Sequence, residues 1–193
     1  MKTQILALSL LLCAAFAFGA DGPCIVPGRG HFYIRTGTAG LFGAFAHDHQ
    51  IEAQKISGCA DLTRSSIKLV FTTTDIKVID PKESESNRAK IQKTMETDVL
   101  RVAEFPQIVF ESTSVERGTA GGALRVHGNL TIRGKTQPLV IPLTFTSLSD
   151  GSYTAKGTYK FKQTTFGIQP VQLGGGTIKV KDELQTEFEL FLK

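Results

Sequence analysis

The residues best suited to chemistry in this 193-residue chain are two histidines that flank an aspartate: His47, Asp48 and His49. Imidazole can bind a metal ion or donate hydrogen bonds to phosphate and carboxylate groups, and its charge changes at about pH 6–7. Alternate side chains of a strand share a face, so both imidazoles lie with Phe45 and Ile51, and Asp48 lies on the other face. The run predicts a contact with a ligand's polar head group, a metal-dependent or redox site, or two histidines hydrogen-bonded at a strand end.

Metal binding is the weaker of the two functional alternatives. A closed zinc site usually has four ligands, Asp48 points away, and the sequence does not place His31 or His127 beside the pair. The chain also contains no HExxH, GxSxG, P-loop or CxxC motif. We therefore expect no metal, no cofactor and no catalysis. Of the two functional alternatives for His47 and His49 we favour head-group contact, and a structural role for both histidines stays open.

The chain begins with a segment that is typical of a secretory signal peptide. Lys2 precedes an uncharged apolar run over residues 5–18, and small residues follow it. The run is too short for a membrane-spanning helix of about 20 residues. Leu12 before Cys13 disfavours a lipoprotein signal. We expect residues 1–20 to be removed, which makes the protein secreted or periplasmic.

The remaining residues, 21–193, are enough for one domain with a sizeable core. The net charge of the whole chain is +4, and no cluster of Lys and Arg is interleaved with aromatic residues, so we expect no nucleic acid partner. No later apolar run is long enough to span a membrane. Thirteen Phe, 19 Gly and no Trp indicate a β-rich protein with many turns.

Two cysteines remain in the expected mature chain, Cys24 and Cys59. In an exported protein such a pair favours a disulfide over two separate thiols. This bond would join the N-terminal segment to the end of a strand.

A predicted hairpin over residues 123–145 has one apolar face. The even positions of its first strand carry Leu124, Val126, Leu130 and Ile132. A turn with the sequence GKTQP follows, and one face of the second strand carries Leu139, Ile141, Leu143 and Phe145. This alternation is the pattern of strands with one buried and one solvated face.

Further strands and one helix complete the chain. The other predicted strands cover residues 31–36, 44–62 with a break near Gly58, 65–78, 107–116, 153–161 and 177–192. Residues 83–101 lack Gly and Pro, and Ile91, Met95 and Val99 recur at helical spacing, with Ser84 or Ser86 as the cap. Residues 164–176 are predicted to be a long loop. About eight antiparallel strands with one inserted helix predict an all-β sandwich or up-and-down barrel, and such a barrel can enclose one ligand.

Four segments in this order resemble the YceI-like family of secreted, lipocalin-like barrels. They are DVLRVAEFPQIVFESTSV, VHGNLTIRGKTQPLVIPLTF, AKGTYKFKQTTFGI and VKDELQTEFELFL. The resemblance implies an extended antiparallel barrel with a long apolar tunnel that binds polyisoprenoid lipids without catalysis. Family members are often dimeric, which implies a homodimer as one arrangement. One departure is Gln163, which stands where many members carry Arg before the Phe-Gly-Ile loop.

The predicted function is to hold a long apolar ligand, a polyisoprenoid or fatty-acyl lipid, for carriage, storage or sensing. Small inner residues such as Ala155 and Gly157 favour an open cavity over a filled core. The candidate lining residues are Ile67, Leu69, Phe71, Phe110, Leu130, Ile132, Phe145, Tyr159, Phe161 and Phe166. We expect the helix to pack over one opening, with His47 and His49 near a barrel mouth.

Overall fold

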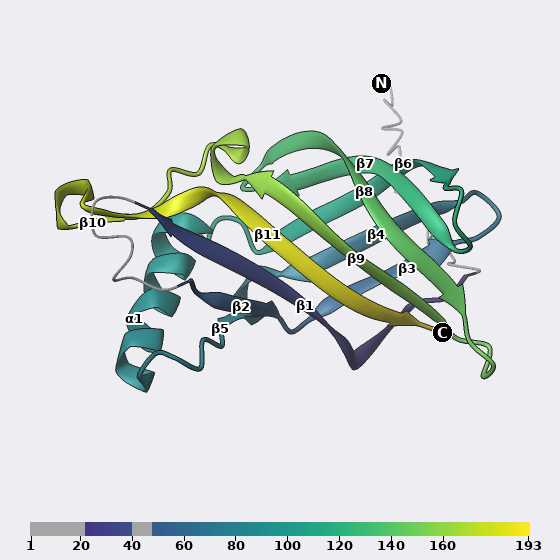
Figure 1. Cartoon of the computed structure of the whole chain (residues 1–193), viewed down its shortest axis with the longest axis horizontal. Helices are drawn as coiled ribbons and strands as arrows, with labels where there is room; N and C mark the ends of the chain where they lie inside the picture. Colours follow the sequence, from purple (N-terminus) through teal and green to yellow (C-terminus); the bar gives the residue numbers. More distant parts are fainter. Residues whose placement is uncertain (1–21, 40–47) are drawn as a thin grey trace, which may run out of the picture.

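A computed structural model of the chain describes residues 22–39 and 48–193. The predicted signal peptide and His47 lie outside these residues. The described residues form one antiparallel sheet that wraps around a common interior, with a single α-helix at one end (Figure 1). The strands are β1 (Ile25–Ala39), β2 (Gln50–Ala53), β3 (Ile56–Asp61), β4 (Ser66–Thr72), β5 (Ile76–Val78), β6 (Gln107–Arg117), β7 (Ala123–Ile132), β8 (Lys135–Ser147), β9 (Tyr153–Lys162), β10 (Gln172–Leu173) and β11 (Ile178–Leu192).

The order of hydrogen-bonded strands is β3-β4-β6-β7-β8-β9-β11-β1-β2-β5, with β10 paired to β11. Strands β2 and β3 are two halves of one ribbon that is interrupted at Gln54 and Lys55, and β2 pairs with β1 while β3 pairs with β4. Strands β4 and β5 are likewise separated by the short 3-10 turn η2 (Thr73–Asp75). The predicted all-β antiparallel barrel with one helix is confirmed. The described residues contain eleven strands, not about eight, because two ribbons are interrupted and β10 is added.

The interruption in the β2–β3 ribbon is not near Gly58, as the sequence predicted, but beside η2. The Gln54 N–H donates to the Asp75 carbonyl (2.9 Å) and the Thr72 N–H donates to the Lys55 carbonyl (3.3 Å). The two breaks therefore satisfy each other's backbone groups, and both ribbons bend at the same place.

The predicted disulfide is present and links the start of β1 to the edge strand β3. The sulfurs of Cys24 and Cys59 are bonded, and the two residues also form a β-bridge between the start of β1 and β3. Cys24 exchanges backbone hydrogen bonds with Lys193 in both directions (2.9 Å each). The bond, the bridge and the C-terminal residue thus meet at one end of the barrel, called the closed end below. The disulfide indicates an oxidising compartment.

Strands β8 and β9 separate over half their length. They pair only between Leu143–Ser147 and Tyr153–Gly157. The Phe145 N–H donates to the Gly122 carbonyl on the β7 side (2.7 Å). Backbone N–H groups alternate in direction along a strand, so those of the even-numbered positions of β8 point toward β9. Two of these, Pro138 and Pro142, have no N–H to donate, and the ladder ends where Pro142 would continue it.

The helix α1 (Glu85–Thr94) continues into a π-helical turn, η3 (Met95–Val99), and lies across the end of the barrel opposite the closed end (Figure 1). Ser84, not Ser86, is the cap, because its Oγ accepts from the Asn87 N–H (3.2 Å). No residue of α1 is fully buried. The helix therefore covers the barrel without being part of its core.

Gln92 fastens α1 to the edge of β5. The Val78 N–H donates to Gln92 Oε1 (2.8 Å), and Gln92 Nε2 donates to the Ile76 carbonyl (3.0 Å). We expect Gln92→Leu to destabilise the fold by about 1–3 kcal/mol, because it leaves the Val78 N–H without its partner. Chemical denaturation measures this loss, and amide hydrogen exchange should show faster opening of α1. Lys93→Leu, on the exposed face, is the control; equal exchange rates in both variants would mean that Gln92 does not hold the helix.

The segment after β9 is more structured than the predicted long loop. It contains the 3-10 turns η4 (Gln163–Phe166) and η5 (Gly174–Gly176), and β10 pairs with the start of β11. Three consecutive glycines with positive φ make the tight connection between these two strands. Across the described ranges, no helix has the length and hydropathy needed to cross a bilayer.

Candidate functional site

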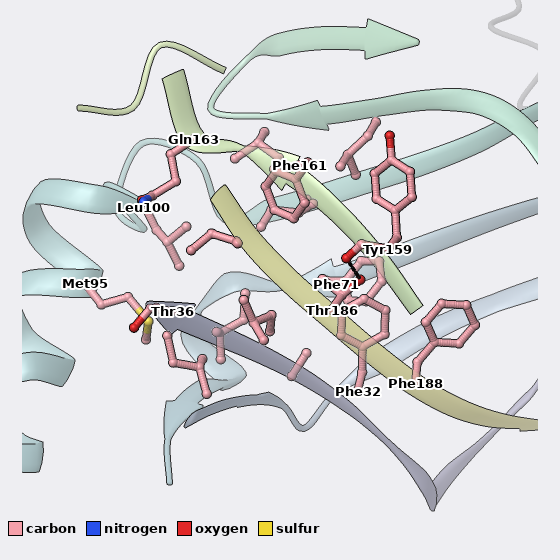
Figure 2. A pocket seen from close by; sticks show the side chains of 18 of the residues that line it. Phe32, Thr36, Phe71, Met95, Leu100, Tyr159, Phe161, Gln163, Thr186 and Phe188 are labelled. Atoms are coloured by element: carbon pink, nitrogen blue, oxygen red, sulfur yellow. Dashed lines mark hydrogen bonds between the residues drawn. The ribbon is translucent and has the colours of Figure 1, made fainter. Parts of the chain in front are cut away.

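A cavity of about 710 Å³ occupies the interior of the barrel. Its wall is built by alternate residues of the strands, because only every second side chain of a strand faces inward. On β1 they include Phe32, Ile34 and Thr36, and on β11 they include Thr186 and Phe188 (Figure 2). Most lining residues are aliphatic or aromatic.

The cavity is sealed at the closed end. Leu192 is fully buried there and packs with Ala60 and Ala155. The rings of Phe145 and Tyr153 stack beside them, with centroids 5.1 Å apart. Apolar side chains therefore fill the barrel next to the disulfide.

The opposite end carries the polar part of the lining. The residues there come from the end of β1, from the segment that leads into α1, from α1 itself and from the start of β11. We call this set the mouth: Thr38, Glu83, Asn87, Lys90 and Lys179. Asn87, Lys90 and Lys179 are exposed to solvent. The cavity is thus a tube with an apolar, sealed bottom and a polar mouth beneath α1.

Eight of the ten predicted lining residues lie in the cavity wall. They are Ile67, Leu69, Phe71, Phe110, Leu130, Ile132, Tyr159 and Phe161. Whether they contact a ligand stays a prediction.

Phe145 and Phe166 do not line the cavity, which corrects that part of the predicted set. Phe145 lies on the inward-facing side of β8, but it belongs to the apolar cluster with Ala155 and Leu192 that fills the closed end. Phe166 lies in η4, is 2 % exposed, and packs edge-on against Phe161 with ring centroids 5.7 Å apart. It belongs to a 3-10 turn and not to a strand, so strand alternation does not apply to it.

Several lining residues were not selected from the sequence. β1 supplies Phe32 and Ile34, and β11 supplies Leu184 and Phe188. The alternation of apolar residues in β11 is visible in the sequence. Nothing in the sequence, however, distinguishes a residue that lines a cavity from one that fills a core. Ile91, Met95 and Val99, for which packing on the barrel was the expected role, also line the cavity.

Two glycines allow aromatic rings of the cavity wall to lie close to the adjacent strands. A Cβ on Gly157 would lie 2.7 Å from Cζ of Phe188, its cross-strand neighbour, and a Cβ on Gly128 would lie 2.5 Å from Cζ of Phe110. Each aromatic ring therefore lies across a glycine on the adjacent strand. Gly157 faces inward as predicted, but the ring of Phe188 occupies the space next to it.

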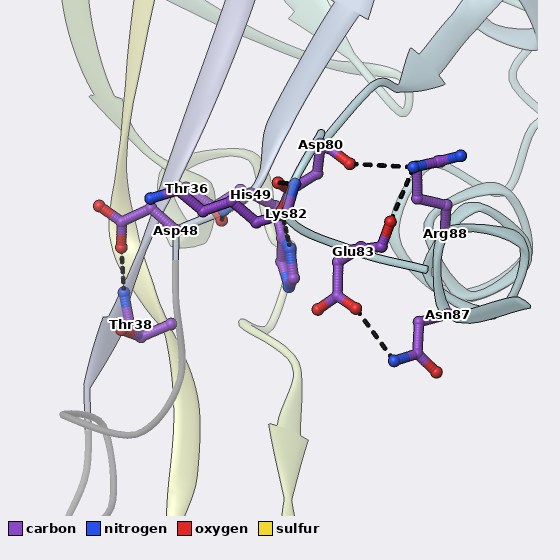
Figure 3. Close-up of polar contacts among 9 residues, drawn as sticks. All are labelled: Thr36, Thr38, Asp48, His49, Asp80, Lys82, Glu83, Asn87 and Arg88. Atoms are coloured by element: carbon purple, nitrogen blue, oxygen red, sulfur yellow. Dashed lines mark hydrogen bonds and ion pairs between the residues drawn. The ribbon is translucent and has the colours of Figure 1, made fainter. Parts of the chain in front are cut away.

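His49 lies in the cavity wall with Ile51, and Asp48 is turned away, bonded to the Thr38 N–H (3.2 Å). The His49 Nδ1 lies 2.9 Å from Oδ2 of Asp80 (Figure 3). Asp80 is 2 % exposed, and its other oxygen accepts from the Lys82 N–H (3.0 Å). A buried carboxylate needs such partners, so the contact gives His49 a structural role.

The same cluster connects the barrel to the start of α1. Arg88 donates to the carbonyls of Asp80 (3.3 Å) and Glu83 (2.7 Å), and the Asn87 side chain donates to Glu83 Oε2 (3.0 Å) (Figure 3). Within residues 22–39 and 48–193, no three His, Cys, Asp or Glu side chains gather as a metal site would require. The head-group contact of His47 and His49 stays a prediction, and His47 lies outside the described residues.

Two further polar side chains reach into the apolar wall. Gln163 is 4 % exposed, and its Nε2 donates to the Lys181 carbonyl (2.9 Å). Tyr159 lines the tube, and burial raises the pKa of its hydroxyl above the ordinary value. Beside Gln163, the Thr164 hydroxyl donates to Asp182 (2.6 Å), and this bond lowers the pKa of the Asp182 carboxyl.

Comparison with known proteins gives one family. The model of the YceI-like domain matches residues 30–192. A UPF0312 protein of Azotobacter vinelandii is 30% identical over 183 residues, covering 88% of each chain. A UPF0312 protein of Shewanella baltica is 29% identical over 164 residues, covering 82% of this chain and 75% of its own.

Solved structures share the fold. A polyisoprenoid-binding domain from Saccharophagus degradans, implicated in plant cell wall breakdown, aligns with a TM-score of 0.66 at 12% identity, over 89% of this chain and 98% of its own. BcnA of Burkholderia cenocepacia aligns with a TM-score of 0.64 at 17% identity, over 86% of this chain and 98% of its own.

Proposed function

This chain belongs to the YceI-like domain family, and on that premise we propose that it is an exported binding protein, without catalytic activity, that holds one long apolar lipid inside its barrel. The ligand is a polyisoprenoid or a fatty-acyl lipid. Its apolar chain lies in the tube and its polar end lies at the mouth. The lipid is held for carriage, storage or sensing, each of which is compatible with a ligand that is shielded from water along its length.

The observation that carries this proposal is the shape and chemistry of the cavity. Its volume of about 710 Å³ lies within the range of small-molecule sites, roughly 300–1,000 Å³. A sealed bottom beside Leu192 and a polar mouth at Lys90 and Lys179 suit a molecule with one apolar and one polar end. The polyisoprenoid-binding domain of Saccharophagus degradans, which shares this fold, supports an isoprenoid as the first candidate.

The expected affinity comes from apolar burial. Each CH₂ group that moves from water into the tube contributes about 0.8 kcal/mol. Affinity should therefore rise with chain length until the tube is full, and then level off. Most side chains of the wall are hydrocarbon, which supports binding through apolar burial.

The test is mass spectrometry of the native protein, purified from an oxidising compartment, with organic extraction and elemental analysis of the same sample. We expect one co-purified lipid per chain, whose fragmentation distinguishes an isoprenoid from a fatty-acyl chain. In parallel, alcohols and acids of increasing chain length are titrated against a fluorescent lipid. A sample without lipid that binds none of these chains, or a sample with stoichiometric metal, would overturn the proposal.

A further inference from the structure

We infer that Gln163 selects the polar group of the ligand, and that this group is an uncharged hydroxyl held at the mouth end of the tube. The ligand class is then a long-chain alcohol, not a phosphate ester. This inference rests on the proposed function, because it assumes that a lipid occupies the cavity.

The first observation is the position of Gln163. It is the first residue of η4, directly after β9, and it is 4 % exposed while lining the cavity. Figure 2 shows its side chain reaching toward Leu100 on the helix side of the tube, with Phe161 nearby. A polar side chain therefore lies in an apolar wall near the mouth.

The second observation is how its amide is used. Nε2 donates to the Lys181 carbonyl (2.9 Å), and since a carbonyl only accepts, this contact fixes which end of the amide is nitrogen. No described residue donates a hydrogen bond to Oε1. Oε1 is not among the enclosed side-chain atoms of the described residues that lack a partner. It is therefore open to the cavity that Gln163 lines, where a hydrogen-bond donor of a ligand can reach it.

The third observation is that the amide is held in place before a ligand binds. The Thr164 N–H and hydroxyl both donate to Asp182 (2.8 and 2.6 Å), and the Ile168 N–H donates to the Gln163 carbonyl (3.2 Å). These bonds fix the turn that carries Gln163. A preorganised acceptor discriminates between ligands because no ordering has to accompany binding.

The chemistry of the surroundings selects a neutral group. The labelled neighbours on this side of the tube, Leu100 and Phe161, are apolar. A hydroxyl donates to Oε1 and buries no charge. A phosphate has no donor for Oε1 when fully ionised, and its charge would lose its hydration here without a counterion. The cationic side chains Lys90 and Lys179 lie at the mouth, where they are exposed.

The experiment compares three ligands of one chain length: a C20 isoprenoid alcohol, its phosphate and the corresponding hydrocarbon. Binding is measured by displacement of a fluorescent lipid from the full domain. For the wild type we expect the alcohol to bind about tenfold more tightly than the hydrocarbon, the difference that one buried hydrogen bond provides. Gln163→Met should remove this preference, so that the alcohol and the hydrocarbon bind with equal affinity. Gln163→Arg should shift the preference to the phosphate.

The matched control is Gln137→Met. Gln137 also donates its side-chain amide to a backbone carbonyl, that of Thr165 (3.3 Å), but it does not line the cavity. It should keep the wild-type preference. A readout without any variant is the NMR signal of the Gln163 amide, which should shift on addition of the alcohol and not of the hydrocarbon.

The outcomes separate this inference from the function on which it rests. If the wild type binds alcohol and hydrocarbon equally, or if Gln163→Met keeps the preference, Gln163 only supports the Lys181 carbonyl and the inference fails while lipid binding stands. If the wild type prefers the phosphate, the selection lies with the lysines of the mouth and the inference also fails. If none of the three ligands binds, the proposed function itself is wrong.

Discussion

Leu69→Trp should weaken the binding of long-chain lipids by about 100-fold while the protein stays folded. Leu69 is half-buried on β4, pairs with Phe110 of the adjacent strand β6, and faces the tube. The larger ring would enter the cavity and displace three or four methylene groups of the ligand. At about 0.8 kcal/mol for each CH₂, and tenfold in affinity for each 1.4 kcal/mol, the loss reaches two orders of magnitude. Titration with chains of increasing length should show a larger loss for longer chains.

The neighbouring position provides the control for this prediction. Val70 is also half-buried, but as the next residue of β4 it faces outward. Val70→Trp should bind lipid with wild-type affinity, and circular dichroism with thermal unfolding checks the fold of both variants. Unchanged affinity in a folded Leu69→Trp protein would show that lipid binds somewhere other than the tube.

Removal of the disulfide should have the largest effect on stability. Cys24 and Cys59 are separated by 35 residues, and closing a loop of this length stabilises a protein by about 3–4 kcal/mol in the chain-entropy account. The double variant Cys24→Ser with Cys59→Ser should lose this amount, which corresponds to a decrease in Tm of roughly 8–15 °C. Chemical and thermal denaturation measure it.

The wild type under reducing conditions is the internal control for the disulfide. It should unfold at the same denaturant concentration as the double variant, and the reductant should leave the double variant unchanged. Stability that is equal with and without the disulfide would mean that the bridge between β1 and β3, together with the pairing of Cys24 and Lys193, closes the barrel alone.

Strand alternation in the sequence predicted the inward face where the strands are regular. Ile67, Leu69 and Phe71 on β4 all face the cavity because β4 is uninterrupted over seven residues. Alternation does not give the position along the barrel, so Phe145 was expected in the tube although it closes the bottom. Phe166 lies in a turn, where the period of two has no meaning.

Contacts between distant segments could not be predicted from the sequence. His49 and Asp80 are separated by 31 residues, and their contact depends on how β2 and β5 align. The break at Gln54 and Lys55 likewise depends on η2, which supplies the acceptor for the Gln54 N–H. Neither segment carries a Gly or Pro that would mark the place.

Whether the barrel is hollow or filled also depends on packing that a sequence pattern does not contain. The rings of Phe110 and Phe188 lie across Gly128 and Gly157 on adjacent strands, which keeps them close to the wall. The same residues in another register would extend into the centre. The composition of the inner face was therefore predictable, and its free volume was not.

The pairing of Cys24 with Lys193 has a consequence for how the protein can be attached to other structures. Both residues lie at the closed end, and the mouth lies at the other end of β11, a strand of 15 residues that spans about 50 Å. A linker, a tag or a surface anchor added after Lys193 therefore leaves the barrel on the side away from the mouth (Figure 1). When the protein is immobilised through this terminus, the opening faces the solution, and lipid exchange with vesicles can be followed without obstruction by the support.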